Sequence, residues 1–436
     1  MTPDRFGLPV TTPSARALTL YIDGVDRLLS ANPGAGSCFR EAIELDPSFS
    51  LAHIASARNS QLYGLMGEAR TAAARAVECC ARSGTARERG HVEALALAIN
   101  GMPEQAMTAL EAHLRDFPRD GFALSMALGV YGLIAFSGRP DHHEAQRALL
   151  ENLAPRWGED WWFLTYLGWS HVETDDPARG AELLERSLAL NPRNAHAAHA
   201  RSHARVELGE ASAGAAFLEA WLPGYDPAGQ LHCHLNWHLA LFELDLGAPE
   251  RAFERYVAAM RPAITQCGPL ATLADSASFL WRCGLYGIGP KDLPWAEVAA
   301  LAEQSFPRAG LAFADLHAAM VAAAIGDTPA FERRVETLRS LDAAGKLPQG
   351  GVVPALCRGL GAYARGEYQE AASMLDAAMA DLTRVAGSHA QREVFEETLI
   401  AACLKCGRVD RARRLLAARL GRRPRVRDSA WLQAAA

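Results

Sequence analysis

The chain has 436 residues, of which 50% are hydrophobic and 22% are charged, and its formal net charge of −6 gives a pI near 6.2. A chain of this length is too long for one simple hydrophobic core, unless it forms an array in which each unit packs only on its neighbours. The slightly acidic balance argues against a nucleic-acid partner, because nucleic-acid-binding domains usually carry a basic patch and a basic pI.

Cysteine content and hydropathy favour the cytoplasm. The nine cysteines are an odd number, and most lie singly in apolar stretches, so we expect free thiols in a reducing compartment. Residues 1–13 contain no apolar run behind a basic start, which argues against a secretory signal. No window of about 18 residues is free of charge and turn residues, so neither a membrane span nor a membrane partner is expected.

Apolar residues recur at intervals of three and four along the chain, in segments separated by Gly, Pro, Asn and Asp. This periodicity predicts an all-helical fold. The clearest unit is residues 161–194, where Gly168, Leu184 and Pro192 stand at the spacing of the tetratricopeptide repeat, about 34 residues long. Pro177 suits the first turn of the second helix, and Pro192 ends that helix because proline cannot continue it.

The same helical-hairpin pattern recurs before and after this unit. It covers residues 37–81, 87–118, 122–153, 233–260, 311–338, 352–380 and 393–420. We therefore predict one domain over residues 1–436, an all-α, tetratricopeptide-like α-solenoid curled into a right-handed superhelix. Residues 1–20 are expected to form an N-terminal arm and residues 421–436 a C-terminal cap or tail. The basic cluster at 408–427 is expected to be a solvated helical face and tail.

Histidines concentrate in one part of the chain, since six of the 14 fall within residues 195–260. His199 and His203 are four residues apart, as are His234 and His238, so each pair projects from one face of a helix. In a tetratricopeptide array the first helix of every hairpin lines the concave groove, and adjacent first helices lie about 8–10 Å apart. The two pairs are therefore expected to approach each other inside the groove.

Three interpretations of these histidines remain open. The first is a divalent metal site at His199, His203, His234 and His238, because imidazole and carboxylate ligands suit zinc, iron or manganese. The HExxH motif of metalloproteases is absent, since Ala200 follows His199. The second is metal-free acid–base chemistry, in which a histidine exchanges protons beside Glu207 or Asp315. The third is structural, with each imidazole hydrogen-bonded to neighbouring groups so that the repeats hold together.

Several of these residues also carry a resemblance to a known family. The run AHAAHARSHARVE begins at residue 195 and HLNWHLALF at residue 234. With DSASFLWR at 275–282, FADLH at 313–317 and GSHAQREVF at 387–395, they resemble the tetratricopeptide repeat protein 38 family over residues 7 to about 404. The resemblance implies a helical-repeat fold and a shared polar centre, but it supplies no activity. His389 and Leu235 stand where the family tends to have Asn.

The resemblance and the groove positions together give a set of candidate site residues. Candidate catalytic residues are His199, His203, Glu207, His234, His238 and Asp315. Candidate ligand-binding residues are Trp162, Trp169, Trp237, Asp275, Ser278, Arg282, His317, Gln391 and Arg392. If the superhelix curls enough to bring them together, Arg282 and Arg392 are expected to clamp a carboxylate or phosphate. We also predict that Gln391 and Arg392 face the same interior as His234.

Two functions follow. The leading hypothesis is a binding protein whose His-, Trp- and Arg-lined interior holds a peptide or protein partner or a small polar ligand. The alternative is an enzyme that acts on a small polar or anionic substrate through a His/Glu/Asp centre, with or without a divalent metal as cofactor. An open groove would favour the peptide, and a closed pocket with converging histidines would favour the enzyme. The sequence predicts no oligomeric state.

Overall fold

The computed structural model describes residues 2–434. Within them the chain is helical, and the only β-pairing is an isolated bridge between Pro3 and Pro9. The first helices are α1 (Ala15–Leu29), α2 (Ala35–Leu45), α3 (Ser50–Leu62), α4 (Met66–Ser83), α5 (Ala86–Ile99), α6 (Pro103–Asp116), α7 (Gly121–Leu124), α8 (Leu133–Phe136), α9 (His142–Leu153), η1 (Ala154–Arg156), α10 (Trp161–Val172), α11 (Pro177–Leu190) and α12 (Ala195–Glu207). The later helices are α13 (Ala211–Trp221), η2 (Leu222–Gly224), α14 (His232–Asp245), α15 (Pro249–Arg255), η3 (Tyr256–Met260), α16 (Pro269–Tyr286), α17 (Trp295–Ser305), α18 (Ala312–Ile325), α19 (Thr328–Ala343), α20 (Val352–Ala364), α21 (Tyr368–Ala378), η4 (Met379–Val385), α22 (His389–Lys405), α23 (Val409–Arg422) and α24 (Val426–Ala434).

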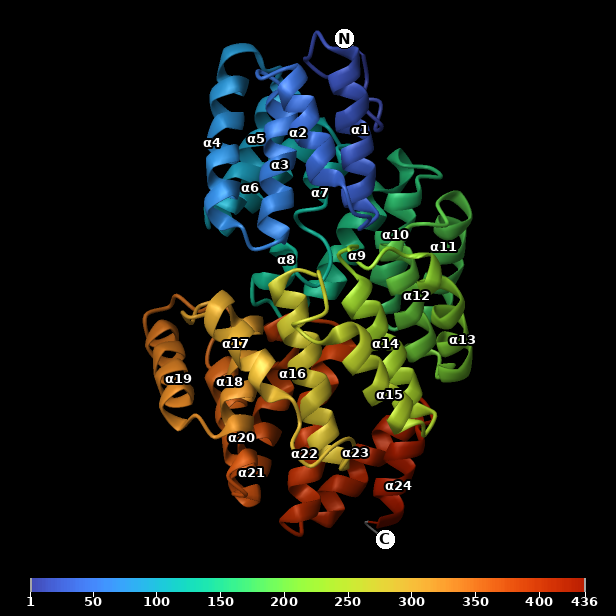
Figure 1. Ribbon diagram of the computed structural model, residues 1–436, viewed down its shortest axis with the longest axis vertical. Helices are drawn as coiled ribbons and strands as arrows, with labels where there is room; N and C mark the ends of the chain where they lie inside the picture. The colour runs from blue at the N-terminus through green and yellow to red at the C-terminus, as the bar shows by residue number, and fades with distance from the viewer. Residues whose placement is uncertain (1, 435–436) are drawn as a thin grey trace.

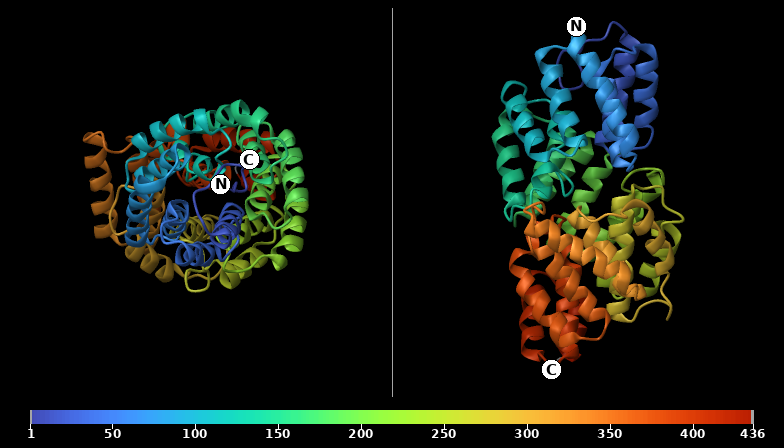
Figure 2. Two further views of the ribbon diagram at one scale, coloured as in Figure 1. Left: turned by 90° about the horizontal axis from the view of Figure 1, so that it is seen from above. Right: turned by 90° about the vertical axis from the view of Figure 1, so that its left-hand side faces the viewer.

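These helices form the predicted α-solenoid, a right-handed superhelix of tetratricopeptide-like hairpins. The N-terminal helices lie at one end of the long axis and α22–α24 at the other (Figure 1). Seen along that axis, the helices follow one another around a ring (Figure 2). The all-α fold class predicted from the periodicity is therefore confirmed.

The hairpin of α10 and α11 shows why the repeat pattern needs small residues. A Cβ atom added to Gly168 would lie 3.0 Å from the carbonyl oxygen of Gly180, and one added to Gly180 would lie 2.4 Å from a methyl group of Val172. Asp160 caps the N-terminus of α10 by accepting main-chain hydrogen bonds, and Asp176 does the same for α11. The backbones of the two helices are therefore in direct contact at these glycines. The two aspartates fix where each helix begins.

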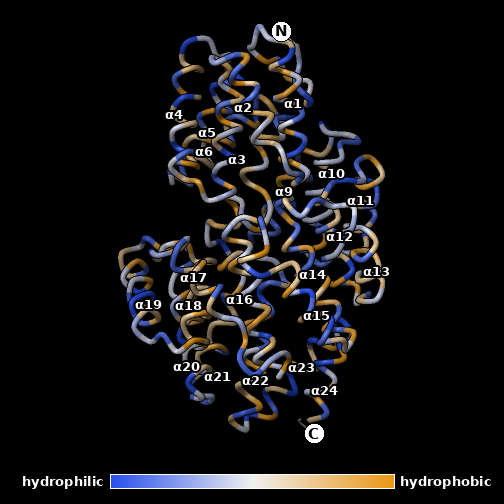
Figure 3. Tube along the Cα trace, in the orientation of Figure 1, coloured by the Kyte–Doolittle hydropathy of each residue, from blue (hydrophilic) through white to orange (hydrophobic). Residues whose placement is uncertain are grey.

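The inner helices are more buried than the outer ones, as expected for a solenoid. In α14 every residue from 233 to 244 is buried, whereas α13 beside it buries only Gly214, Ala215 and Leu218. The inner helices bring their polar side chains into the interior as well, because they have little solvent-exposed surface. Hydrophilic positions on an outer helix such as α19 can be followed in Figure 3.

The superhelix curls far enough to bring distant helices together. The α22 helix returns to α16, where Arg282 donates to Glu397 at 2.8 Å and the Trp281 indole donates to Thr398 at 2.9 Å. Gln391 at the start of α22 also donates to the Tyr131 hydroxyl at 3.3 Å, which joins two successive turns of the coil. Polar residues from widely separated repeats can therefore share one interior.

The ends of the described chain are tied into the fold. Helix α1 begins at Ala15, within the segment expected to be an arm. Before it, Asp4 pairs with the buried Arg87 at 2.8 Å and Arg5 pairs with Asp160 at 2.9 Å. The nine cysteines have free thiols. No helix among residues 2–434 is both long and apolar enough to cross a membrane.

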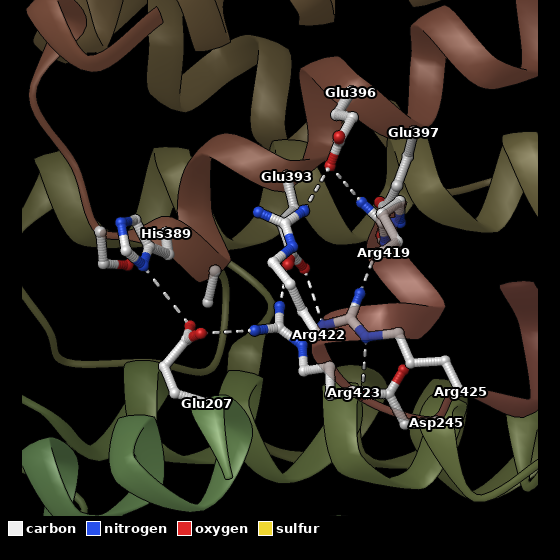
Figure 4. Close-up of polar contacts among 12 residues, drawn as sticks. Glu207, Asp245, His389, Glu393, Glu396, Glu397, Arg419, Arg422, Arg423 and Arg425 are labelled. Atoms are coloured by element: carbon white, nitrogen blue, oxygen red, sulfur yellow. Dashed lines mark hydrogen bonds and ion pairs between the residues drawn. The ribbon is translucent and has the colours of Figure 1, made fainter. Parts of the chain in front are cut away.

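The expectation of a solvated basic face and tail at 408–427 holds for Arg414 and Arg422, which are exposed, but it is wrong for Arg419, Arg423 and Arg425. Arg419, Arg423 and Arg425 are 2%, 6% and 6% exposed. They pair with carboxylates of α12, α14, α22 and α24. Figure 4 shows Arg423 reaching Glu207 of α12, at 2.8 Å, and the carboxylates of α22 beside it. The last segment of the chain therefore closes one end of the superhelix with buried ion pairs instead of extending into solvent.

Candidate functional site

Four histidines from two neighbouring inner helices meet inside the superhelix. His199 and His203 come from α12, and His234 and His238 from α14. One ring nitrogen of each lies within 4.8 Å of the corresponding nitrogens of the other three. The Nε2 atom of His199 is 3.0 Å from Nε2 of His203 and 3.0 Å from Nε2 of His234. We call these four residues the four-histidine cluster.

The sequence positions these rings by simple helix geometry. The alanine-rich α12 has high helix propensity and begins at Asn194, whose side chain accepts the Ala197 main-chain N–H. The spacing of four residues then aims each histidine pair from one face of its helix. The Trp169 ring stacks on His199 and the Trp237 ring on His234, with ring centroids 5.4 Å and 5.2 Å apart. These tryptophans restrict the orientation of the imidazoles.

Two carboxylates hold the outer nitrogens of the cluster. Asp275 of α16 lies 2.8 Å from Nδ1 of His234, and Glu173, at the end of α10, lies 3.2 Å from Nδ1 of His203. The second oxygen of Glu173 accepts the main-chain N–H of His389 at 3.0 Å. A carboxylate on Nδ1 fixes the tautomer and turns the Nε2 lone pair inward, which is the arrangement found behind metal-binding histidines.

The ring protons of the four histidines are too few to give every ring nitrogen of the cluster a hydrogen bond. Nδ1 of His234 donates to Asp275, so Nε2 of His234 carries a lone pair. His199 Nε2 faces the Nε2 atoms of both His203 and His234, yet it has at most one proton to offer. His238 is fully buried and neither of its ring nitrogens has a hydrogen-bond partner among residues 2–434. A cation placed among the four nitrogens would satisfy them together.

This cation is not a proton, because burial lowers the pKa of the imidazoles. Burial, reinforced by the other three histidines, holds the pKa of His199 well below its usual value, and burial does the same for His238. Burial opposes ionisation of Glu173, but nearby His389 and the hydrogen bond from His203 outweigh it and lower the pKa of this carboxyl. His199 and His238 are therefore neutral and Glu173 is ionised near neutral pH, the protonation states that metal binding requires of these groups.

A cavity of about 150 Å³ adjoins the cluster. His199 and His234 form part of its wall, together with Trp169, Gln391 and Arg58. These residues come from α3, α10, α12, α14 and α22, so the cavity lies where successive turns of the superhelix meet. The predicted placement of Gln391 on the same interior as His234 agrees with the structure. Arg392 is buried but lies elsewhere, with Nη1 3.2 Å from His143 Nε2.

The remaining candidates with charged side chains lie outside the cluster. Glu207 pairs with Arg423 at 2.8 Å. Asp315 pairs with Arg334 and accepts the main-chain N–H of Gly310 at 2.8 Å. Arg282 is neutralised by Glu397, so neither it nor Arg392 reaches the cavity as a clamp.

The other candidate ligand-binding residues pack within the protein. Trp162 and Trp237 are fully buried in the hydrophobic core, and the Trp237 indole donates to Ser278 at 3.2 Å. His317 Nδ1 donates to the carbonyl oxygen of Phe313 at 2.7 Å. Of the predicted aromatic positions, only Trp169 lines the cavity beside the four-histidine cluster.

Two residues near the cluster were not found from the sequence. Glu173 lies in the turn after α10, among three other acidic or turn-forming residues, so no periodicity marks it. Arg58 is one arginine in an otherwise unremarked helix, α3, and only the curl of the superhelix brings it to the cavity. Neither residue has a local sequence signal, because both act through long-range contacts.

Comparison with known proteins adds only distant similarities. No protein-family model matches the chain. A crystal structure of yeast Tom70 is 13% identical with a TM-score of 0.32, covering 96% of this chain and 95% of that one. The human IFIT1 dimer with PPP-AAAA is 13% identical with a TM-score of 0.44, covering 100% of this chain and 97% of that one.

Buried neutral histidines predict acid sensitivity of the metal-free protein. Burial lowers the pKa of His142 and of His317 to about 4, whereas in the unfolded chain each titrates near about 6.5. As pH falls from about 6.5 to 4, these two histidines become protonated in the unfolded chain before they do in the folded protein. The free energy of unfolding therefore falls by up to about 1.4 kcal/mol per pH unit for each residue. We expect the urea midpoint, followed by circular dichroism in the presence of a chelator, to fall across this window. A His317→Asn variant should show a shallower fall, and an unchanged slope would contradict the assignment.

Proposed function

We propose that the protein binds a divalent transition-metal ion at His199, His203, His234 and His238 and presents it to a small polar ligand in the adjoining cavity. The observation that carries the proposal is the meeting of Nε2 atoms at 3.0 Å, with carboxylates on the Nδ1 side of two of the rings. A tetrahedral ion with nitrogens at about 2.0–2.1 Å needs ligand nitrogens about 3.3 Å apart, close to the 3.0 Å between Nε2 of His199 and the Nε2 atoms of His203 and His234. Four imidazole ligands suit zinc, copper, iron or nickel.

The position of the cavity supports a role beyond holding the metal. His199 and His234 line it, so a ligand atom in the cavity would approach the ion from the side that protein does not cover. A metal ion in this position can polarise a bound oxygen, which makes an enzyme reaction of the ligand the natural extension of the binding role. The volume of about 150 Å³ is below the roughly 300–1,000 Å³ of common small-molecule sites, which supports a small ligand over a peptide.

A second candidate is a purely structural metal site. Four protein ligands are the usual number for a structural zinc site, whereas catalytic sites commonly use three. The cluster joins α12 to α14, and its carboxylate partners extend that connection to α10 and α16. In this case the ion would stabilise consecutive hairpins without meeting a ligand.

Elemental analysis of the purified full chain tests the proposal. We expect about one equivalent of transition metal, lost on prolonged chelation at mildly acid pH and recovered on titration with Zn²⁺. Because metal binds the folded state, zinc at about 100 times its Kd should stabilise the protein by about 2.7 kcal/mol and raise the Tm. A chain that holds no metal and whose Tm does not respond to zinc would exclude both the functional and the structural site.

A further inference from the structure

Arg58 of α3 is a cation without an anion at the wall of the cavity. Its Nη1 donates to the Gln61 side chain at 2.6 Å, while its Nε is buried with no hydrogen-bond partner. No carboxylate among residues 2–434 lies within ion-pairing distance of its guanidinium. Burial lowers the pKa of Arg58 to about 10, so the side chain still carries its charge near neutral pH.

Most buried arginines of the described chain are neutralised by carboxylates, whereas Arg392 contacts His143 and main-chain carbonyl oxygens instead. Arg87 pairs with Asp4 and Asp120, each at 2.8 Å, and Arg282 pairs with Glu397 at 2.8 Å. Removing a guanidinium from water is costly unless an anion or several hydrogen-bond acceptors compensate for the lost solvation. Arg58 therefore differs from these arginines in having an unmet need for an anion, and it meets the cavity where that anion could bind.

The rest of the cavity wall has the character of an anion site. No Asp or Glu belongs to it, and its polar side chains include Tyr131, Gln230, Gln391 and His196, which can donate hydrogen bonds while neutral. Apolar side chains make up much of the remainder: Leu28, Leu29, Leu62, Leu128 and Val130. Such a wall suits a molecule with one anionic group and a short hydrocarbon part.

We propose that the cavity binds a small organic anion whose carboxylate or phosphate oxygens pair with Arg58 while its other end extends toward His199 and His234. The contact with Arg58 stands by itself, and only the contact with a metal at the histidines rests on the proposed function. A guanidinium presents its N–H groups as a planar fork that matches two oxygens of either anion. The ligand class thus follows from Arg58, and the small volume limits the ligand to a few carbon atoms.

Calorimetric titration of the full chain with butyrate and propyl phosphate, metal-free and zinc-loaded, tests this inference. Butyramide is the neutral control, because it has nearly the shape of butyrate without its charge. We expect saturable binding of at least one anion and at least about tenfold weaker binding of butyramide, since hydrogen bonds to charged groups are stronger than those between neutral groups. The anion that binds more tightly identifies the group, carboxylate or phosphate, that the site prefers.

Substitution of Arg58 separates this site from the metal site. Arg58→Gln should weaken the anion at least about tenfold and leave the metal content unchanged, and Arg58→Lys should retain part of the affinity because it keeps the charge without the fork. Arg40→Gln, on the exposed surface of the neighbouring α2, is the matched control and should bind as the wild type does. Equal binding of butyrate and butyramide, no binding of either anion, or full affinity in Arg58→Gln would overturn the inference. Anion binding through Arg58 in a protein that takes up no metal would uphold it while refuting the proposed metal function.

Discussion

Replacing His199 with alanine is expected to abolish stoichiometric metal binding. His199 is the central ligand, because its Nε2 lies 3.0 Å from Nε2 of both His203 and His234, the two rings held by carboxylates. Its removal takes away the one ring whose nitrogen adjoins both of the others. In elemental analysis and zinc titration we expect metal content to fall from about one equivalent to near zero, with loss of the zinc-dependent rise in Tm.

A histidine two residues from His234 supplies the control for this experiment. His232 is half-buried on the same helix, α14, and its ring lies 6.2 Å from that of Tyr225 instead of joining the cluster. His232→Ala should keep its metal and its response to zinc. Equal metal content in His199→Ala and wild type would place the ion elsewhere. Equal loss in both variants would mean that folding, not ligation, determines metal content.

The helices of the site were predictable from local patterns, and so was the meeting of the two histidine pairs. The spacing of four residues fixes the face of each helix, and neighbouring inner helices in a repeat array lie side by side. The structure brings His199, His203, His234 and His238 together as this reasoning predicts. Asp275 was named through the family resemblance as a ligand-binding residue, and the structure places it against Nδ1 of His234.

Contacts between distant repeats were not predictable in the same way. Arg282 and Arg392 were expected to bind a ligand. Instead, Arg282 of α16 pairs with Glu397, and Arg392 at the start of α22 contacts His143. Arg58 of α3 lies at the cavity only because the curl of the superhelix brings α3 close to α10, α12 and α14, which depends on the small rotation between successive hairpins. That rotation is set by the packing of many residues together, and no single sequence motif predicts it.

The ion pairs at the C-terminal end are another long-range arrangement that the sequence did not predict. A run of arginines near the end of a chain is usually solvated, yet here Arg419 and its neighbours face acidic residues from α12, α14 and α22 (Figure 4). Glu397 of α22 lies at the centre of this group. It pairs with Arg282 at 2.8 Å, with Arg427 at 2.8 Å and with Arg419 at 3.2 Å. One carboxylate thus joins three elements of the fold.

Substituting Glu397 with glutamine is therefore expected to destabilise the protein by about 3–5 kcal/mol, because it leaves buried guanidiniums without their shared anion while preserving the shape of the side chain. Glutamine excludes a cavity as the cause, so the loss measured by urea unfolding reports charge. The adjacent Glu396 is the matched control, since its side chain is 19% exposed and Arg419 keeps two other carboxylates without it. Glu396→Gln should cost about 1 kcal/mol or less. Similar losses in the two variants would show that the buried network contributes no more than a surface pair, and that the C-terminal segment is held mainly by its apolar contacts.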